Sequence, residues 1–240
     1  MPKIIFESKN KFNKVYDHPE PASKNMPEWW KSLDPFINDQ NLNMQHLMKY
    51  APNSHGVPNV GVKKCMPVLD SLSTGYIIKL HCDIKFEQVN GIQEAFFTSA
   101  TVPISKWTPE QFNGYDIPEE YTKQVYKWNS NWIIKTPPGY SCLFVHPIGY
   151  NSLPFKSLTG VVDTDTLVTD INNPFIIKKS FNGLISAGTP IVQVIPFKRE
   201  DWTSEITEVS QEEMSIRNEG LFKRITGSYK KSFRSNKNYK

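Results

Sequence analysis

Two histidines and one aspartate form the clearest metal-binding pattern in this sequence. His81 and Asp83 are separated by one residue inside the apolar run 76–86, and His146 ends a later apolar run. Side chains at positions i and i+2 of a strand point to the same face, so a strand here would present His81 and Asp83 together. Two imidazoles and one carboxylate can hold Fe(II) on one side and leave positions open for dioxygen and a co-substrate. These three residues are candidate metal ligands.

A basic residue extends this pattern, because Lys156 stands ten residues after His146. The arrangement resembles Fe(II)/2-oxoglutarate-dependent oxygenases, and the resemblance implies Fe(II) and 2-oxoglutarate as cofactors, Lys156 as the anchor of the co-substrate, and a relative of the jelly roll as the fold. That family usually has arginine at this position, whose planar fork suits a carboxylate better than an ammonium group does. In the alternative interpretation, His81 pairs with Asp83 on a solvated strand face and His146 only ends a strand.

An acidic turn lies within residues 136–199, which contain TPPGYSCLFVHP, SLTGVVDTD and ISAGTPIVQVIP in this order. The order resembles the dUTPase and dCTP deaminase superfamily, and it implies that Asp163 activates water or positions a nucleotide's 3′-hydroxyl. The chain departs from that family in two places: Pro147-Ile148-Gly149-Tyr150 lacks the phosphate-binding arginine, and Thr166 replaces a tyrosine. The alternative is that Asp163 and Asp165 form a hydrogen-bonded turn between strands.

A longer series of motifs runs along nearly the whole chain. It comprises PASKNMPEWWK at 21–31, KCMPVLDS at 64–71, PPGYS at 137–141, GVVDTD at 160–165 and GTPIVQVIPFKR at 188–199. This series resembles an uncharacterised protein family of marine tailed bacteriophages. The resemblance implies a phage origin, with the host cytoplasm or the virion as the location, and it implies no activity.

Short apolar runs between proline and glycine turns dominate the middle of the sequence. Asn90-Gly91 predicts a hairpin, and a short helix is expected from Pro118 to about Trp128. From Ser210 onward, apolar residues at helical spacing with acids near the start predict a C-terminal helix. Strands are expected at residues 76–86, 132–134, 141–145, 158–162, 174–178 and 190–197. The pattern predicts a mainly β fold of jelly-roll or β-clip type.

This pattern divides the chain into three parts. Residues 1–62 are expected to form an irregular N-terminal arm and loops, 63–202 a single β-rich core domain, and 203–240 a C-terminal helix and basic tail. Residues 221–240 carry seven basic residues and no acid, so the net charge of +4 leaves −3 for the remainder. Such a tail predicts contact with nucleic acid or an acidic protein face, unless it is only a solvated terminus.

Composition excludes several classes of protein. The three cysteines have no CxxC spacing, and the N-terminus lacks the apolar stretch of a signal peptide, so a secreted disulfide-rich protein is not expected. No run of eighteen apolar residues predicts a membrane span, and no GxGxxG, P-loop or GxSxG motif occurs.

The expected function is that of a phage-encoded accessory or virion-associated β-protein. It would act through contacts with other proteins, as a homo-oligomer or with phage or host partners, because the strand edges of such folds are often closed by assembly. An oxygenase that uses His81, Asp83 and His146 is the first alternative. A dUTPase-like nucleotide-binding protein centred on Asp163 is the second.

Overall fold

The computed structural model describes residues 2–8, 18–36, 61–167, 169–222, 229–235 and 237–240. The chain divides into two compact units. The first, here called the β unit, comprises Met1–Asn25, Thr74–Glu200 and Tyr239. The second unit comprises Met26–Ser73, Asp201–Asn238 and Lys240.

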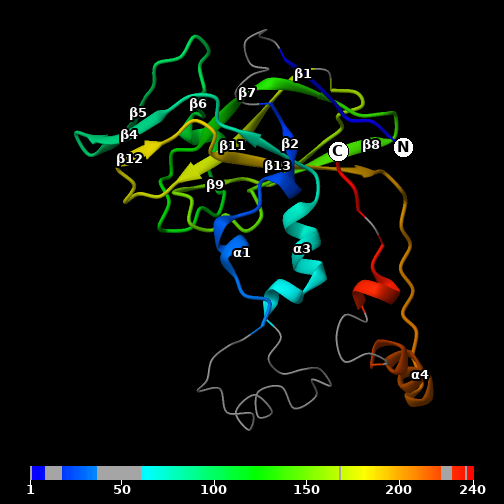
Figure 1. Cartoon of the computed structure of the whole chain (residues 1–240). Coiled ribbons are helices and arrows are strands. Elements are labelled where there is room, and N and C mark those ends of the chain that lie inside the picture. The colour runs from blue at the N-terminus through cyan, green and yellow to red at the C-terminus, as the bar shows by residue number, and fades with distance from the viewer. Residues whose placement is uncertain (1, 9–17, 37–60, 168, 223–228, 236) are drawn as a thin grey trace, which may run out of the picture. The chain divides into compact units, whose positions relative to one another are not determined.

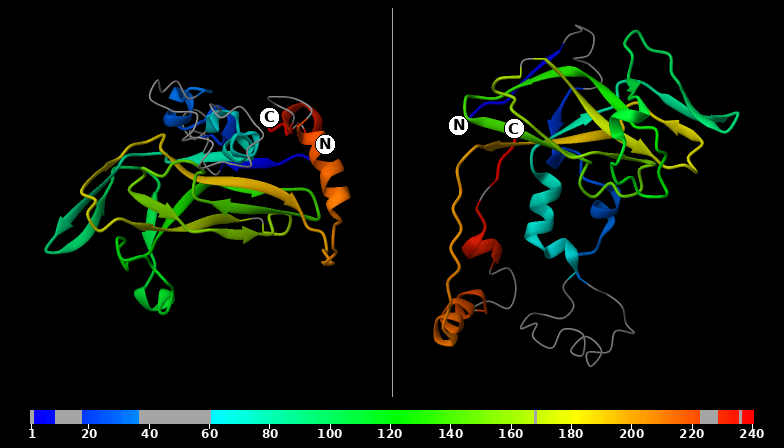
Figure 2. Two further views of the ribbon diagram at one scale, coloured as in Figure 1. Left: turned by 90° about the horizontal axis from the view of Figure 1, so that it is seen from below. Right: turned by 180° about the vertical axis from the view of Figure 1, so that it is seen from behind.

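The β unit consists of antiparallel strands in three sheets (Figure 1; two further views in Figure 2). The first sheet has the order β1-β7-β11-β9, with β6 also paired to β7. Its strands are β1 (Ile5–Ser8), β6 (Ile104–Lys106), β7 (Tyr126–Lys135), β9 (Phe155–Ser157) and β11 (Asp170–Ile177). The second sheet has the order β10-β8-β13-β3-β2. Its strands are β2 (Glu20–Pro21), β3 (Tyr76–Lys79), β8 (Tyr140–Val145), β10 (Gly160–Val162) and β13 (Pro190–Lys198).

The third sheet is smaller and has the order β12-β4-β5. Its strands are β4 (Ile84–Val89), β5 (Ile92–Phe96) and β12 (Gly183–Ile185). The expected hairpin at Asn90-Gly91 is confirmed, and it joins β4 to β5. Asn90 has φ 52° and Gly91 has φ 77°, so both central residues adopt the left-handed conformation of a two-residue hairpin turn. The predicted mainly β fold is confirmed: the first two sheets pack as a β-sandwich around a shared core.

Aromatic side chains fill the core between the sheets. Trp128 on β7 stacks on Phe175 of β11, with ring centroids 3.6 Å apart and planes 8° apart. Tyr126 stacks on the same Phe175 ring at 5.4 Å, and Phe155 of β9 meets Trp128 edge-on at 4.9 Å. All four side chains are fully buried. Their burial removes a large apolar area from water, which is the main contribution that holds the sheets together.

The helix expected from Pro118 to about Trp128 is wrong, because β7 begins at Tyr126. Tyr126 and Trp128 are buried while Lys127 between them is partly exposed, which is the alternation of a strand with one face in the core. Residues 118–125 contain a turn at 119–120 and an isolated bridge between Tyr121 and Lys178, and their last residues lead directly into the strand. Burial of two large aromatic side chains decides the conformation here, against the weak helix signal of Pro118.

The second unit contains helices and turns. Its described elements are α1 (Glu28–Ser32), the 3-10 turn Val62–Lys64, α3 (Met66–Ser73), α4 (Gln211–Phe222) and a π-helical turn (Tyr229–Phe233). The predicted C-terminal helix is confirmed as α4. Ser210 begins it with a capping box, in which the Ser210 Oγ accepts the Glu213 N–H at 3.2 Å and the Glu213 carboxylate accepts the Ser210 N–H at 3.4 Å. None of the helices in the described ranges combines the length and the apolar character needed to cross a membrane.

Two glycines with positive φ provide a matched test of backbone packing in the β unit. Gly75 has φ +72°, and a Cβ there would lie 2.1 Å from the Val194 carbonyl oxygen, whereas Gly188 has φ +83° with no atom within 4 Å. Gly188→Ala is expected to lower the free energy of unfolding by about 1–2 kcal/mol, the cost of the left-handed conformation. Gly75→Ala is expected to lower it by about 3 kcal/mol or more, because β13 must also move. Urea unfolding of both variants measures the difference, and equal losses would contradict the close approach.

Candidate functional site

The acidic turn of the sequence follows β10 and is held by an arginine from the end of β13. The Asp165 carboxylate, whose side chain is only 5% exposed, forms a two-bond ion pair with Arg199 and accepts the Gly139 N–H at 2.8 Å. The Ser141 hydroxyl donates to Asp163 Oδ1 at 2.6 Å, and Arg199 Nη1 donates to the same oxygen at 3.2 Å. The cluster therefore joins three segments: the turn before β8, the turn after β10 and the end of β13.

The charges in this cluster keep the Asp165 carboxylate ionised. The hydrogen bond from Arg199 is the largest cause that lowers the pKa of Asp165 to about 2, while desolvation opposes it. A carboxylate that stays ionised at such low pH is a poor general base. The Asp163 side chain is instead 59% exposed. Its Oδ1 accepts both of the side-chain hydrogen bonds described above, from Ser141 and from Arg199. Asp163 is therefore a solvent-facing carboxylate on a rigid turn, and its proposed nucleotide role stays a prediction.

Sequence reasoning gave Arg199 no role. Only four of the 28 basic residues are arginines. Two of those four form multiple hydrogen bonds to one aspartate each, Arg199 to Asp165 and, in the second unit, Arg234 to Asp70. Arginine presents a planar fork that matches a carboxylate, which lysine cannot reproduce. In a chain this rich in lysine, the rare arginines were the signal that could have pointed to these two pairs.

The expected iron ligands His81 and Asp83 do not lie on one strand. The run 76–86 is not one strand, because β3 ends at Lys79 and β4 begins at Ile84 in a different sheet. His81 and Asp83 lie in the break, so the strand alternation that would pair them does not apply. His81 Nε2 is 3.0 Å from the Thr101 hydroxyl, and Asp83 Oδ1 accepts the Ala187 N–H at 2.7 Å.

His146 has no ring nitrogen left for a metal. Its Nδ1 accepts the Ser157 N–H at 3.3 Å, and its Nε2 donates to the Tyr150 carbonyl at 3.2 Å. Burial is the main cause that lowers the pKa of His146, so the neutral imidazole is favoured. Lys156 lies on β9 with its side chain exposed. Within the described residues, no group of three His, Cys, Asp or Glu side chains gathers in a way that could hold a metal ion.

The basic tail is partly neutralised within the second unit. The Asp70 carboxylate on α3 receives Arg234 at 2.6 Å and Lys237 at 2.9 Å. The hydrogen bond from Arg234 is the first cause that lowers the pKa of Asp70, and desolvation opposes it. Two of the seven basic residues in 221–240 therefore serve an internal contact, which reduces the charge available to an external polyanion.

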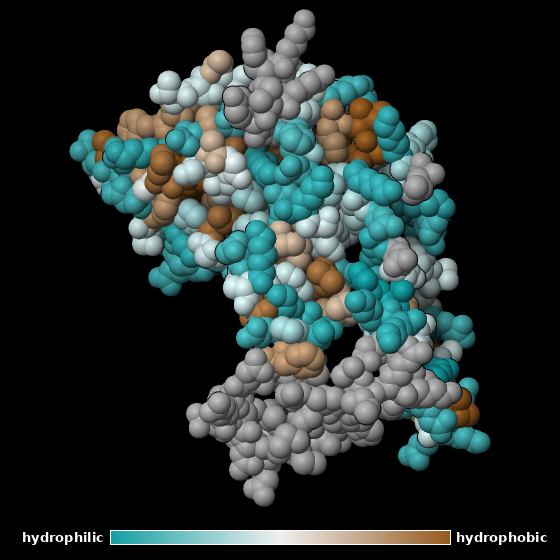
Figure 3. Space-filling view, in the orientation of Figure 1, coloured by the Kyte–Doolittle hydropathy of each residue, from teal (hydrophilic) through white to brown (hydrophobic). Residues whose placement is uncertain are grey.

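The third sheet exposes an apolar surface. Its outer face, defined here by the residues that alternate away from the core, carries Lys85, Glu87, Val89, Ile92, Glu94, Phe96 and Leu184. Leu184, Lys85 and Phe96 form one row across the three strands. A hollow of about 870 Å³ lies on this face and is lined in part by Asp83, Phe96 and Phe97. Figure 3 shows apolar atoms gathered over β4, β5 and β12 on its left side.

Comparison with known proteins assigns no family to the chain. No family model matches any part of it, and no curated protein matches it in sequence.

The pH dependence of stability tests the Asp165 ion pair. The folded pKa of Asp165, about 2, lies below its ordinary value of 3.8, so the ion pair stabilises the fold above about pH 4 and this contribution is lost as the pH falls toward 2. Asp165→Asn is expected to destabilise the protein at neutral pH and to flatten the fall of the urea midpoint between pH 4 and 2. Asp116→Asn, at an exposed loop position, is the control. An unchanged slope in Asp165→Asn would contradict the role of this pair.

A metal titration tests the expected iron site directly. From the hydrogen bonds of His146 and the break at His81, we expect no stoichiometric binding of Fe(II) under anaerobic conditions, with or without 2-oxoglutarate. His81→Ala is expected to behave like the wild type. One equivalent of bound iron with a 2-oxoglutarate-dependent visible absorption band, both lost in His81→Ala, would restore the oxygenase interpretation.

Proposed function

We propose that this protein is a non-enzymatic, phage-encoded accessory or virion-associated protein that acts through protein contacts, and that it uses the outer face of the third sheet to bind a second copy of itself. The observation that supports this function is the exposure of that face. Ile92 is 62% exposed, Leu184 55% and Phe96 49%. Large apolar side chains gathered on one face are typical of a surface that another protein covers. The phage context rests on the sequence motifs described above.

The charges of the outer face favour a second copy over an unrelated partner. The face carries both signs, with Lys85 and Glu87 paired on β4 and Glu94 on β5 paired with Lys106. In a twofold interface the same surface contributes from both sides, so it must be complementary to itself. One end of the face has Leu184 and Phe96 on either side of Lys85, and the other end has Val89 opposite Ile92, so apolar groups and charges of both signs are available from each copy. A partner of strongly acidic or basic character would find no complementary field there.

The edges of the third sheet add a second reason. Strands β5 and β12 are its two ends, and each pairs on one side only with a strand of the described chain. An unpaired strand edge presents N–H and C=O groups to another chain, and natural proteins protect such edges or use them in assembly. The exposed side chains of the face and its open edges together support an assembly function.

The oligomeric state tests this proposal. Phe96→Ser with Leu184→Ser removes two exposed apolar side chains from the outer face, so the fold should be retained. We expect wild type to sediment as a dimer at tens of micromolar concentrations and the double variant as a monomer, a weakening of at least about tenfold.

Val161→Ser is the control, because Val161 is 61% exposed on β10, in the second sheet. It should leave the dimer intact. A monomeric wild type, or a double variant that still dimerises, would contradict the proposed contact.

A further inference from the structure

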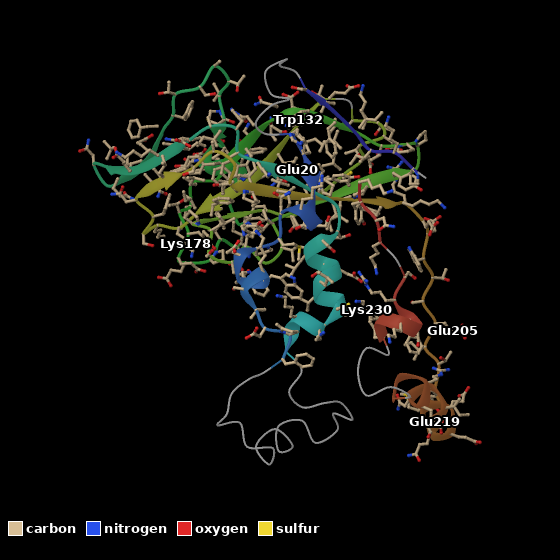
Figure 4. The ribbon with its side chains drawn as sticks, viewed as in Figure 1. Glu20, Trp132, Lys178, Glu205, Glu219 and Lys230 are labelled. Carbon is tan, nitrogen blue, oxygen red and sulfur yellow. The ribbon has the colours of Figure 1, made fainter. Side chains whose placement is uncertain are left out.

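The outer face of the third sheet has an open hollow at one end and an exposed apolar turn at the other. The hollow of about 870 Å³ lies where β4 begins and β5 ends, and its lining includes Asp83, Phe97 and Thr98. The β4–β5 turn lies at the opposite end, where Val89 is 40% and Ile92 is 62% exposed. Figure 4, viewed as in Figure 1, shows this hairpin at the left. The two features therefore lie along the same two strands.

A twofold dimer through this face can be arranged in two ways. When two sheets pack face to face, the twofold axis lies in the plane between them, and it runs either along the strands or across them. An axis along the strands keeps the strand direction, so each residue lies at the level of the same residue in the second copy. An axis across the strands reverses the direction, so the turn of each copy lies against the opposite end of the other.

The charges on β4 favour the reversed arrangement. Lys85 and Glu87 both point to the outer face and form an ion pair with each other. In the parallel arrangement the two lysines share one level and the two glutamates another, so like charges meet. In the reversed arrangement with the axis at the level of Phe86, each lysine lies against the glutamate of the second copy. Four charges of alternating sign then surround the axis, and such a network contributes more than an isolated exposed pair does.

The same register brings the turn of one copy to the hollow of the other. Val89 is three residues from Phe86 in the direction of the turn, and Asp83 is three residues from it in the direction of the hollow. On β5, Ile92 and Thr98 lie three residues on either side of the residue that pairs with Phe86. Reversal about this level therefore places Val89 and Ile92 of one copy over the hollow of the other.

We infer that the two copies pack in this reversed register, so that the β4–β5 turn of each copy fills the hollow of the other. The inference rests on the proposed function, because its partner is a second copy of the chain. The apolar side chains of the turn leave water when they enter a hollow lined in part by Phe96, Phe97 and Leu184. Burial of apolar side chains in this way is the main source of stability at a dimer interface.

Chemical cross-linking between two single-cysteine variants tests the register. Cys65→Ser and Cys82→Ser first remove the two native thiols that are not buried. Ile92→Cys and Thr98→Cys are then made in separate chains, both at exposed positions, and sedimentation checks that each variant still dimerises. In the reversed register, residues 92 and 98 of the two copies lie about 10 Å apart, whereas the two copies of residue 92 are separated by about 20 Å along the strands. A short bismaleimide should therefore link the mixed chains at least about tenfold more than either variant alone.

Val161→Cys replaces Thr98→Cys in the control mixture, because Val161 is equally accessible at 61% exposure but lies on β10 in the second sheet. It should give no link to Ile92→Cys. A dimer in which Ile92→Cys links to itself, or in which the mixture gives no link, would overturn the reversed register and leave the proposed assembly function standing. A wild type that sediments as a monomer would overturn both.

Discussion

One chain of hydrogen bonds through the aromatic core connects the two large sheets. The Trp128 Nε1–H on β7 donates to the Ser157 hydroxyl on β9 at 2.9 Å, and that hydroxyl donates to the Ile191 carbonyl on β13 at 2.6 Å. A buried indole N–H must find an acceptor, so the polar chain fixes where Trp128 stacks on Phe175. Apolar burial supplies the stabilising free energy, and these two bonds select one arrangement of the sheets.

Buried polar side chains also fix chain segments at the periphery of the β unit, because each buried polar group must find a hydrogen-bond partner. Gln193 on the central strand β13 is buried; its carbonyl oxygen accepts the Ile148 N–H at 2.9 Å, and its amide donates to the Thr74 carbonyl at 2.7 Å. At the end of that strand, the Asp165–Arg199 ion pair likewise joins separate chain segments. Gln193 and Arg199 belong to the GTPIVQVIPFKR motif and Asp165 to the GVVDTD motif, so these motifs describe structural contacts. The residue types in these motifs are accounted for by these contacts and do not by themselves indicate an active site.

The β4–β5 hairpin carries the surface that we propose for assembly. Its outer face carries apolar side chains and charges of both signs, and a hollow near its tip is lined by Ile92 of that face together with lysine and glutamine side chains. Strand alternation sends Glu87 and Gln88 to opposite faces of the hairpin. A small sheet at the edge of a large core can therefore offer an assembly surface without disturbing the stacked aromatic side chains.

The sequence by itself determined the fold class, the hairpin at Asn90-Gly91 and the C-terminal helix, because these depend on local signals: residue period, turn residues and capping. It could not determine that the run 76–86 breaks after Lys79, since an unbroken apolar alternation is equally suited to one strand or to two strands in different sheets. Because of this break, His81 and Asp83 do not lie together on one face of a strand, as their spacing had predicted. The pairing of Asp165 with Arg199 was likewise decided only by the tertiary structure, because it depends on groups from distant parts of the chain brought together by folding.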